Sequence, residues 1–282
     1  MLGRPVAEQL KRDGFDITVM SSNVDRARTI LGEEFDLTYG NVTDKESLKK
    51  PIEGKDFIYI NLSARLVPEM YQKIEIDGTT NVAATAVEMA VKRIGLISGA
   101  SVTQGQKGII YADAKMEAEK AVMESGVAYT IMRPSWFFES LPFFVQKGRA
   151  AVIGKKQVKF SWLAASDYAR QVSNAFQKEE AANKCFYSLG PQKMTMLEAL
   201  TKFCSRHYPD IKPQVIGFTM AKIMSKLPGA EMLKLAVPFF MYFSRITEDV
   251  NPSEADRILG PNLTTIDEWL ARWEEPELKD IL

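Results

Sequence analysis

Histidine and cysteine are scarce in this sequence of 282 residues. Its one histidine is His207, and its two cysteines, Cys185 and Cys204, do not form a CxxC pair. A zinc site needs several such ligands, so this composition argues against one. A serine hydrolase would have to use His207, which stands in the stretch CSRHYPD, where nothing marks a catalytic site.

The sequence also lacks an excess of either charge. Lysine plus arginine and aspartate plus glutamate each total 36 residues, which argues against nucleic acid as a partner. Long apolar runs are missing too: the most apolar stretch, 232–246, contains Lys234, Pro238 and Arg245 and falls short of the ~20 residues that span a bilayer. No signal peptide is recognised at the start. We therefore expect a soluble cytoplasmic protein with no integral membrane segment.

Helix and strand patterns alternate through the first half. Leu2, Val6 and Leu10 recur every four residues, and Pro5 and Gly14 stand near the two ends of this pattern, which predicts a helix. Strand patterns follow at 15–20, 35–40, 55–63, 94–98 and 128–134, with helix patterns at 25–31, 44–52, 77–93 and 111–126. This alternation predicts a parallel sheet with helices on both faces. A ligand site is then expected at the carboxyl ends of the strands, in the loops 21–23, 40–44, 61–65, 98–103 and 133–138.

The pattern changes near residue 140. The later part mixes short strands with helices, and its helix in SWLAASDYARQV is expected to be capped by Ser166 or Asp167. A closing helix over 264–275 is expected to be capped by Thr265 or Thr264. The sequence thus predicts a first domain over 1–140 and a small α/β cap over 141–282 that shares its core.

The stretch YADAK carries the clearest chemical signal. Tyr111 and Lys115 stand four residues apart, so on a helix the phenol and the ammonium share one face. A nearby cation is expected to lower the pKa of a phenol, and such a pair can relay a proton to or from a carbonyl or an alcohol. Ser98 and Ser101 follow the preceding strand and supply hydroxyls at the same edge. The alternative is a surface tyrosine and lysine on an ordinary amphipathic helix.

The order of strand, serine, YxxxK helix, strand and Arg133-Pro134 resembles the short-chain dehydrogenase/reductase superfamily. The resemblance is to its atypical NmrA-like branch, which includes relatives of the isoflavone reductases and of the nucleotide-binding accessory subunit of respiratory complex I. It implies a doubly wound Rossmann-type sheet and an NAD(P)-dependent oxidoreductase that reduces a carbonyl or quinone-like apolar small molecule. It further implies that Tyr111 is the general acid/base, that Lys115 activates it and anchors the ribose, and that Ser98 or Ser101 binds the carbonyl.

The family resemblance also implies a missing piece. Members begin with a strand and a GxxGxxG turn, whose backbone approaches the pyrophosphate at a helix N-terminus. Gly3 corresponds to the last of these glycines, so the first strand and two glycines would lie before Met1. The alternative is a chain that is naturally short and has lost this phosphate cradle.

Further cofactor residues follow from the resemblance. The loop Ser21-Ser22-Asn23 stands where the adenosine ribose is read and contains no acid, which favours NADP over NAD; nearby Arg26 is expected to help hold the phosphate. Contacts with the adenine are expected from Asn41 and Val42. Asn61, Leu62 and Ser63 are expected to lie under the ribose and pyrophosphate. Pro134 and Ser135, beside Arg133, are expected to line the nicotinamide pocket.

Two features leave the function open. Glu75 stands where extended relatives often carry asparagine, and several NmrA-like proteins bind a nucleotide without catalysis, so a non-catalytic NAD(P)-sensing or assembly protein is the alternative. A nucleotide-sugar epimerase or dehydratase ranks third. Helices 77–93 and 111–126 form dimer faces in relatives and would allow a homodimer. Aromatic and methionine side chains could form either the core between cap and sheet or an apolar substrate pocket: Trp136, Phe137, Phe138, Phe143, Phe144, Met220, Met224, Phe239, Phe240, Met241 and Phe243.

Overall fold

The expected parallel strands form two separate sheets. In the computed structural model, which describes residues 2–102, 109–156 and 158–274, four strands lie in the order β3-β4-β5-β9 and all run parallel. Their bounds are β3 Phe57–Ile60, β4 Arg93–Ile97, β5 Ala128–Pro134 and β9 Lys184–Ser188. A second sheet pairs β1 (Thr18–Ser21) with β2 (Asp36–Tyr39), also in parallel. Met1, residue 103 of the expected loop 98–103 and the end of the expected helix 264–275 lie outside the described residues.

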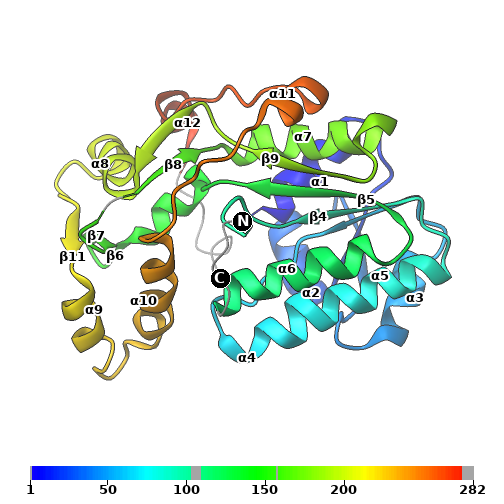
Figure 1. The fold of residues 1–282 in the computed structure, drawn as a ribbon, viewed down its shortest axis with the longest axis horizontal. Helices are drawn as coiled ribbons and strands as arrows, with labels where there is room; N and C mark the ends of the chain where they lie inside the picture. The colour runs from blue at the N-terminus through cyan, green and yellow to red at the C-terminus, as the bar shows by residue number, and fades with distance from the viewer. Residues whose placement is uncertain (1, 103–108, 157, 275–282) are drawn as a thin grey trace.

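Helices cover both faces of the larger sheet, as the sequence predicted (Figure 1). α1 (Gly3–Arg12), α7 (Ala165–Gln177) and α11 (Ser253–Leu259) pack on one face. α5 (Gly78–Glu88) and α6 (Ile110–Met123) pack on the other. All five residues of β4 are buried, which is typical of a parallel strand covered on both sides. The shorter helices of this half are α2 Val24–Leu31, η1 Lys45–Leu48, α3 Lys49–Ile52, α4 Pro68–Met70 and the π-helical η2 Tyr71–Asp77.

A gap separates β1 from β3. None of the described residues forms a strand between them, so the facing edges of β1 and β3 take part in no ladder with each other. A cavity of about 2640 Å³ begins here, and Leu2, Met20 and Ile58 are among the side chains that line it. From the family resemblance, the first strand of the sheet is expected in this gap between β1 and β3.

The second half contributes to both the main sheet and the cap. α7 and β9 join the main sheet layers, whereas β8 (Lys159–Trp162) and β10 (Gln192–Thr195) form an antiparallel pair in the cap. A parallel pair of β11 and β7 extends into a hairpin with β6. The remaining cap elements are β6 Val145–Gln146, β7 Arg149–Ile153, β11 Gln214–Ile216, η3 Phe138–Phe144, η4 Glu179–Ala181, α8 Met196–His207, α9 Phe218–Met224, α10 Glu231–Phe243 and α12 Ile266–Arg272.

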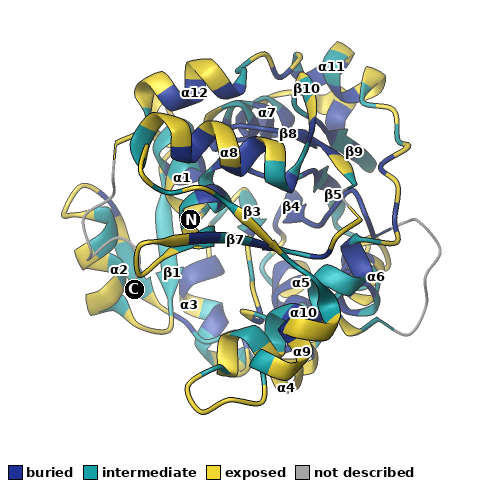
Figure 2. Cartoon of the chain, turned by 90° about the vertical axis from the view of Figure 1, so that its left-hand side faces the viewer, coloured by how far each residue is buried: buried dark blue, intermediate teal, exposed yellow. Residues whose placement is uncertain are grey.

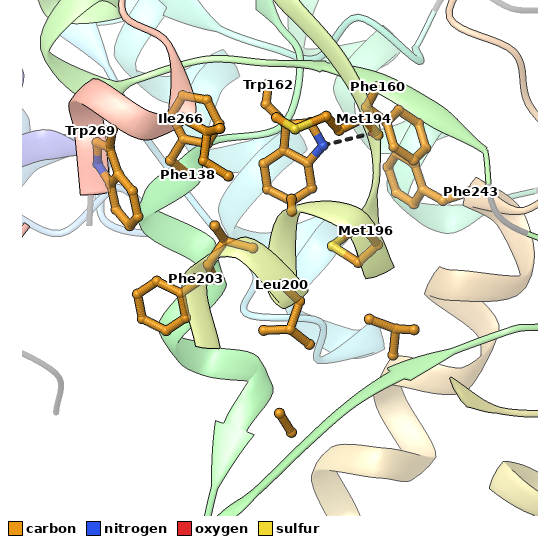
Figure 3. Close-up of a cluster of buried hydrophobic side chains, with 14 of the residues drawn as sticks. Phe138, Phe160, Trp162, Met194, Met196, Leu200, Phe203, Phe243, Ile266 and Trp269 are labelled. Carbon is orange, nitrogen blue, oxygen red and sulfur yellow. Dashed lines mark hydrogen bonds between the residues drawn. The ribbon is translucent and has the colours of Figure 1, made fainter. Parts of the chain in front are cut away.

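An aromatic core holds the cap together (Figure 3). Phe138 and Trp162 are fully buried and stack with ring centroids 6.0 Å apart. The Trp162 indole donates a hydrogen bond of 2.9 Å to the carbonyl oxygen of Met194, so its one polar atom is satisfied. Trp269 packs on Phe138 from α12. These contacts place the C-terminal helix against the same core as η3 and β8.

Local signals in the later half are partly confirmed. Thr265 caps α12 in a capping box with Glu268, as expected. The expected cap of α7 is wrong, because its N-cap is Ala164, whose side chain makes no capping bond. Asp167 instead accepts hydrogen bonds from the backbone N–H groups of Leu263 and Thr264, at 2.9 and 2.8 Å. A carboxylate expected to cap its own helix therefore ties down a segment nearly a hundred residues away.

Candidate functional site

The loop after β1 is shaped by its own side chains. Ser21 Oγ accepts a hydrogen bond of 3.1 Å from the N–H of Asn23, and Asn23 Oδ1 accepts one of 2.9 Å from the N–H of Arg26, which caps α2. Ser22 and the Arg26 side chain remain exposed and line the cavity. A hydroxyl and a guanidinium on a capped helix start suit a phosphate group.

The start of α1 lies beside the end of β3. A Cβ placed on Gly3 would lie 3.4 Å from Asn61 Nδ2, so the absence of a side chain brings the backbone close to this amide. The N-cap residue Leu2 provides no side-chain hydrogen bond, which leaves the first amides of α1 to other partners. Gly3 and Asn61 both line the cavity. The positive end of a helix dipole beside an amide fits an anion such as a pyrophosphate.

The remaining adenine and ribose candidates are mainly turn formers. Asn41 Oδ1 accepts hydrogen bonds from the N–H and the hydroxyl of Thr43, at 3.1 and 2.9 Å. Val42 is buried, and a Cβ on Gly78 would come within 2.8 Å of its Cγ2. Ser63 Oγ accepts from the N–H of Arg65 at 3.2 Å. The structure brings these predicted residues to the cavity lining together: Asn41, Val42, Asn61, Leu62 and Ser63.

Buried polar atoms without partners gather at the ends of β4 and β5. The hydroxyls of Ser98 and Ser135 and the indole nitrogen of Trp136 are buried and have no hydrogen-bond partner among the described residues. Leaving such a group unsatisfied costs roughly 1–3 kcal/mol. Three such atoms thus lie at neighbouring strand ends, where a bound ligand or water can supply the missing partners. Pro134 lies between them, and its carbonyl accepts from the Ala100 N–H at 2.9 Å.

Tyr111 and Ser101 meet at Gly99. A Cβ on Gly99 would lie 3.0 Å from the Tyr111 hydroxyl and 3.9 Å from Ser101 Oγ. The Ser101 carbonyl accepts a hydrogen bond of 2.9 Å from the Tyr242 hydroxyl. The phenol is thus close to the loop after β4. Ser98 and Ser101 both belong to this loop, so both stay candidates for binding the substrate carbonyl. Arg133 does not join them, because it is paired with Glu119 on α6, with Nε–Oε1 and Nη2–Oε2 distances of 3.0 and 2.6 Å.

Lys115 is held by a buried carboxylate. Its Nζ lies 2.7 Å from Glu75 Oε2, with side chains 9% and 5% exposed, respectively. The other oxygen, Glu75 Oε1, accepts from the Ala64 N–H at 2.9 Å. Glu75 stands in η2, and π-helical turns are frequent at functional sites. The ion pair fixes the ammonium on the face of α6 that also carries Tyr111, one helical turn away.

The expected activation of Tyr111 is wrong. Burial raises the pKa of Tyr111, and the carboxylate of Glu75 raises it further, with smaller contributions from Tyr71 and Tyr242. Burial and Glu75 also raise the pKa of Tyr71 to about 12. The YxxxK spacing shows the charge of Lys115 but not the buried carboxylate of Glu75 that neutralises it. The phenol is therefore protonated at neutral pH.

The aromatic cluster divides between core and cavity. Phe137, Phe138 and Phe243 are buried in hydrophobic clusters. Seven others form an apolar wall on the cap side of the cavity: Trp136, Phe143, Phe144, Met220, Met224, Phe239 and Phe240. Met241 is half-buried and does not line the cavity. Tyr111, Lys115, Ser98, Ser101 and Ser135 are not among the lining residues. Phe239 connects the two regions, since its ring centroid lies 5.4 Å from that of Tyr111 and 6.0 Å from that of Trp136.

Two functional features went beyond the sequence analysis. The Glu75–Lys115 ion pair was signalled only by an acid where asparagine is usual, and Trp136 gave no sign that its indole nitrogen lacks a partner. Within the described residues, no cluster of three or more histidine, cysteine or acidic side chains could hold a metal ion. No helix in that part of the chain is long and apolar enough to cross a membrane.

Comparison with known proteins identifies the family. The sequence pattern of the NAD(P)H-binding family matches residues 1–162, and the chain belongs to that family. A Claviceps fusiformis agroclavine dehydrogenase is 26% identical over 137 residues, which cover 45% of this chain and 46% of that protein. The photosystem II assembly factor Ycf39 of Trieres chinensis is 21% identical over 234 residues, 81% of this chain and 73% of the relative.

Solved structures share the fold over nearly the whole chain. A Citrobacter triphenylmethane reductase in complex with NADP(H) superposes with a TM-score of 0.76 at 18% identity, covering 96% of this chain and 95% of that one. An Escherichia coli NADPH-dependent quinone oxidoreductase in complex with NADPH gives 0.75 at 20% identity, with the same coverage. A Staphylococcus aureus nucleoside-diphosphate-sugar epimerase gives 0.73 at 18%, covering 95% of each chain. The Rossmann-type architecture expected from the sequence is thereby confirmed.

Proposed function

We propose that this chain is an NAD(P)H-dependent reductase of an apolar carbonyl or quinone-like small molecule. The observation that carries the proposal is the group of buried polar atoms without partners, Ser98 Oγ, Ser135 Oγ and Trp136 Nε1, beside a cavity with an aromatic wall. Such a combination suits a mostly apolar ligand with a few polar atoms. The NADPH-bound reductases of the same fold support it by analogy.

The residues present fit a dinucleotide. The Gly3 amide region and Asn61 would hold the pyrophosphate, and Ser135 would face the nicotinamide end. Ser22 and Arg26 favour the 2′-phosphate of NADPH, because the loop 21–23 offers no acid to a ribose hydroxyl. When bound, the nicotinamide supplies a hydride to the substrate.

The chain's own residues would then control the proton. Tyr111 would donate it to the substrate oxygen and recover one from solvent, while Ser98 or Ser101 would bind that oxygen. Its raised pKa keeps the phenol protonated, which favours reduction over the reverse oxidation, where a phenolate base is needed. Lys115 would orient the ribose through the N–H groups of its ammonium that are not bonded to Glu75.

A second candidate function is supported by the same ion pair. Glu75 neutralises Lys115, and this removes the activation on which proton relay in the resemblance depends. A chain that binds NAD(P)H and reduces nothing, acting as a sensor or in assembly, would tolerate this arrangement. The two candidates differ in whether any substrate consumes NADPH.

The test measures NADPH oxidation with quinones and aromatic aldehydes, together with NADPH and NADH titrations by fluorescence. Tyr111→Phe is expected to lower turnover at least tenfold with unchanged NADPH affinity, because proton donation contributes ~10²–10⁴-fold. Tyr129→Phe is the matched control, since Tyr129 stands near the amino end of β5, away from the site. Undiminished turnover by Tyr111→Phe would refute the catalytic assignment. Binding without turnover of any compound would favour the second candidate.

A further inference from the structure

An exposed apolar surface covers the hairpin of α9 and α10. Met220, Ile223, Leu227 and Met232 are 55%, 58%, 60% and 66% exposed. The first three stand at helical spacing, and hydrogen bonds from Lys226 N to Ile223 O and from Leu227 N to Met224 O continue the turns beyond α9. They therefore form one outward stripe, while Ala221 on the opposite side is fully buried.

Lysines flank this stripe. Lys222 and Lys226 stand four residues apart on α9 and the turn after it, and Lys234 follows on α10. All three are exposed, and none forms an ion pair within the described part of the chain. Residues 215–246 contain four basic residues and a single acid, Glu231, although the whole chain is balanced at 36 of each sign. The hairpin is thus a local positive surface with an apolar centre.

The hairpin also forms the lip of the cavity. Met220 and Met232 are both exposed and lining residues, and Met224, Leu233 and Ala236 continue the wall inward. In Figure 1 α9 stands at one end of the molecule, and α10 lies between it and α6. Figure 2 shows exposed residues along both of them. A partner on this surface would sit at the mouth of the cavity.

We propose that the α9–α10 hairpin docks on the surface of an anionic lipid bilayer. Apolar side chains with flanking lysines are the composition of helices that lie in the membrane interface, where the apolar face enters the acyl boundary and the lysines meet anionic headgroups. Charge decides against a second copy of the chain as the occupant. Two copies meeting through this surface would bring their lysines together, with Glu231 as the one acid to offset them.

Docking would place the mouth of the cavity against the bilayer, in which apolar compounds dissolve. That an apolar substrate enters from the bilayer rests on the proposed function, whereas docking itself does not. Oxidation of NADPH by a water-soluble quinone is measured without vesicles. A failure of docking and a failure of the proposed reaction therefore give different results.

The test is co-sedimentation of the full chain with vesicles of phosphatidylcholine alone and with vesicles that also contain phosphatidylserine. We expect binding to the anionic vesicles that weakens as salt is added. Lys222→Gln with Lys226→Gln should lower the partition coefficient roughly 30-fold, about fivefold for each lysine. Ile223→Ser with Leu227→Ser should abolish binding at all salt concentrations.

The matched control removes the same charge elsewhere. Lys50 and Lys120 are exposed on α3 and α6, and their exchange for glutamine should leave the partition coefficient unchanged. Circular dichroism establishes that each variant is folded. Equal partitioning of the wild type and the Lys222/Lys226 variant would overturn the proposal. A dimer detected by light scattering that Ile223→Ser with Leu227→Ser converts to monomer would also overturn it, because the occupant would then be a second copy.

Discussion

Glu75 and Lys115 form a buried ion pair of 2.7 Å that joins the π-helical η2 to the helix bearing Tyr111. Two charges at this depth are stable only together, because each alone would pay the cost of leaving water. The pair therefore fixes the position of the ammonium and at the same time cancels its effect on the phenol. This relationship distinguishes the site from one in which lysine alone faces tyrosine.

Glu75→Gln should destabilise the protein and change its pH dependence. Breaking a buried pair on one side costs about 3–5 kcal/mol, measured as the free energy of unfolding in urea. Since Glu75 raises the pKa of Tyr111, its removal lowers that pKa, and the alkaline limb of the rate against pH should move to lower pH. Adding Lys115→Met should recover most of the stability. An unfolding free energy equal to that of the wild type in the single variant would contradict the role of the pair.

Arg26→Ala should weaken NADPH binding about tenfold and leave NADH binding unchanged. The guanidinium is exposed and lines the cavity together with Ser22; under the proposed function it would meet the 2′-phosphate of NADPH and no ribose hydroxyl. The loss corresponds to about 1.4 kcal/mol for one charge-assisted contact. Fluorescence titration measures both constants, and Arg28→Ala on the same helix serves as the control. Equal weakening for the two nucleotides would exclude Arg26 from phosphate recognition.

The half-buried Tyr59 and the fully buried Tyr168 should make the protein sensitive to alkali. The hydroxyls of Tyr59 and Tyr168 are 3.0 Å apart, and burial raises the pKa of both phenols. A group whose pKa is higher in the folded state contributes stability below its unfolded value of about 10. That stability is lost as pH rises beyond it. The free energy of unfolding should therefore fall above about pH 10, and the fall should be smaller when both tyrosines are phenylalanine.

The single variants give the control for this pair. Tyr168→Phe leaves the Tyr59 hydroxyl without its partner and should cost about 1–3 kcal/mol at neutral pH. The double variant removes both hydroxyls and should cost less than the sum of the two single changes. Additive costs would show that the hydrogen bond between the two rings does not contribute.

A short apolar strand fused before residue 1 should raise both stability and NADPH affinity. The edges of β1 and β3 face a cavity lined by apolar side chains, and a strand with a glycine-containing turn would pair with them and lead into Gly3. Melting temperature and NADPH titration measure the two effects. A polar glycine-serine fusion of equal length is the control. Identical values for the two fusions would mean that this space does not accept a strand.

The periodicity of the first half was enough to predict its parallel strands and covering helices, but not their division into two sheets. The strand predicted at 128–134 has those same bounds, because apolar strand residues between turn residues define both ends. The helix predicted at 77–93 ends at Glu88 and is preceded by η2, which periodicity does not distinguish from a regular helix. Asp167 shows the main limit: a cap and a long-range acceptor need the same carboxylate, and only the fold decides between them.

The candidate site was predictable in its placement more than in its chemistry. Strand ends locate Ser98, Ser135 and the loop 21–23, because parallel strands bring their carboxyl ends to one edge. The protonation of Tyr111 depends on burial and on a carboxylate thirty-six residues earlier in the sequence. No local motif contains that information.

The division between β1 and β3 has a mechanical consequence. The loop 21–23 follows a strand of one sheet and the buried serines follow strands of the other, and within the described residues no backbone ladder joins the two sheets. A dinucleotide that contacts both sheets would link them across the gap between β1 and β3. Part of its binding free energy would then go into aligning the two halves. AMP, which would reach only the sheet of β1 and β2, would bind without fixing the two sheets relative to each other. The intact dinucleotide would therefore raise the melting temperature by more than the sum of the increases caused by its two mononucleotide halves.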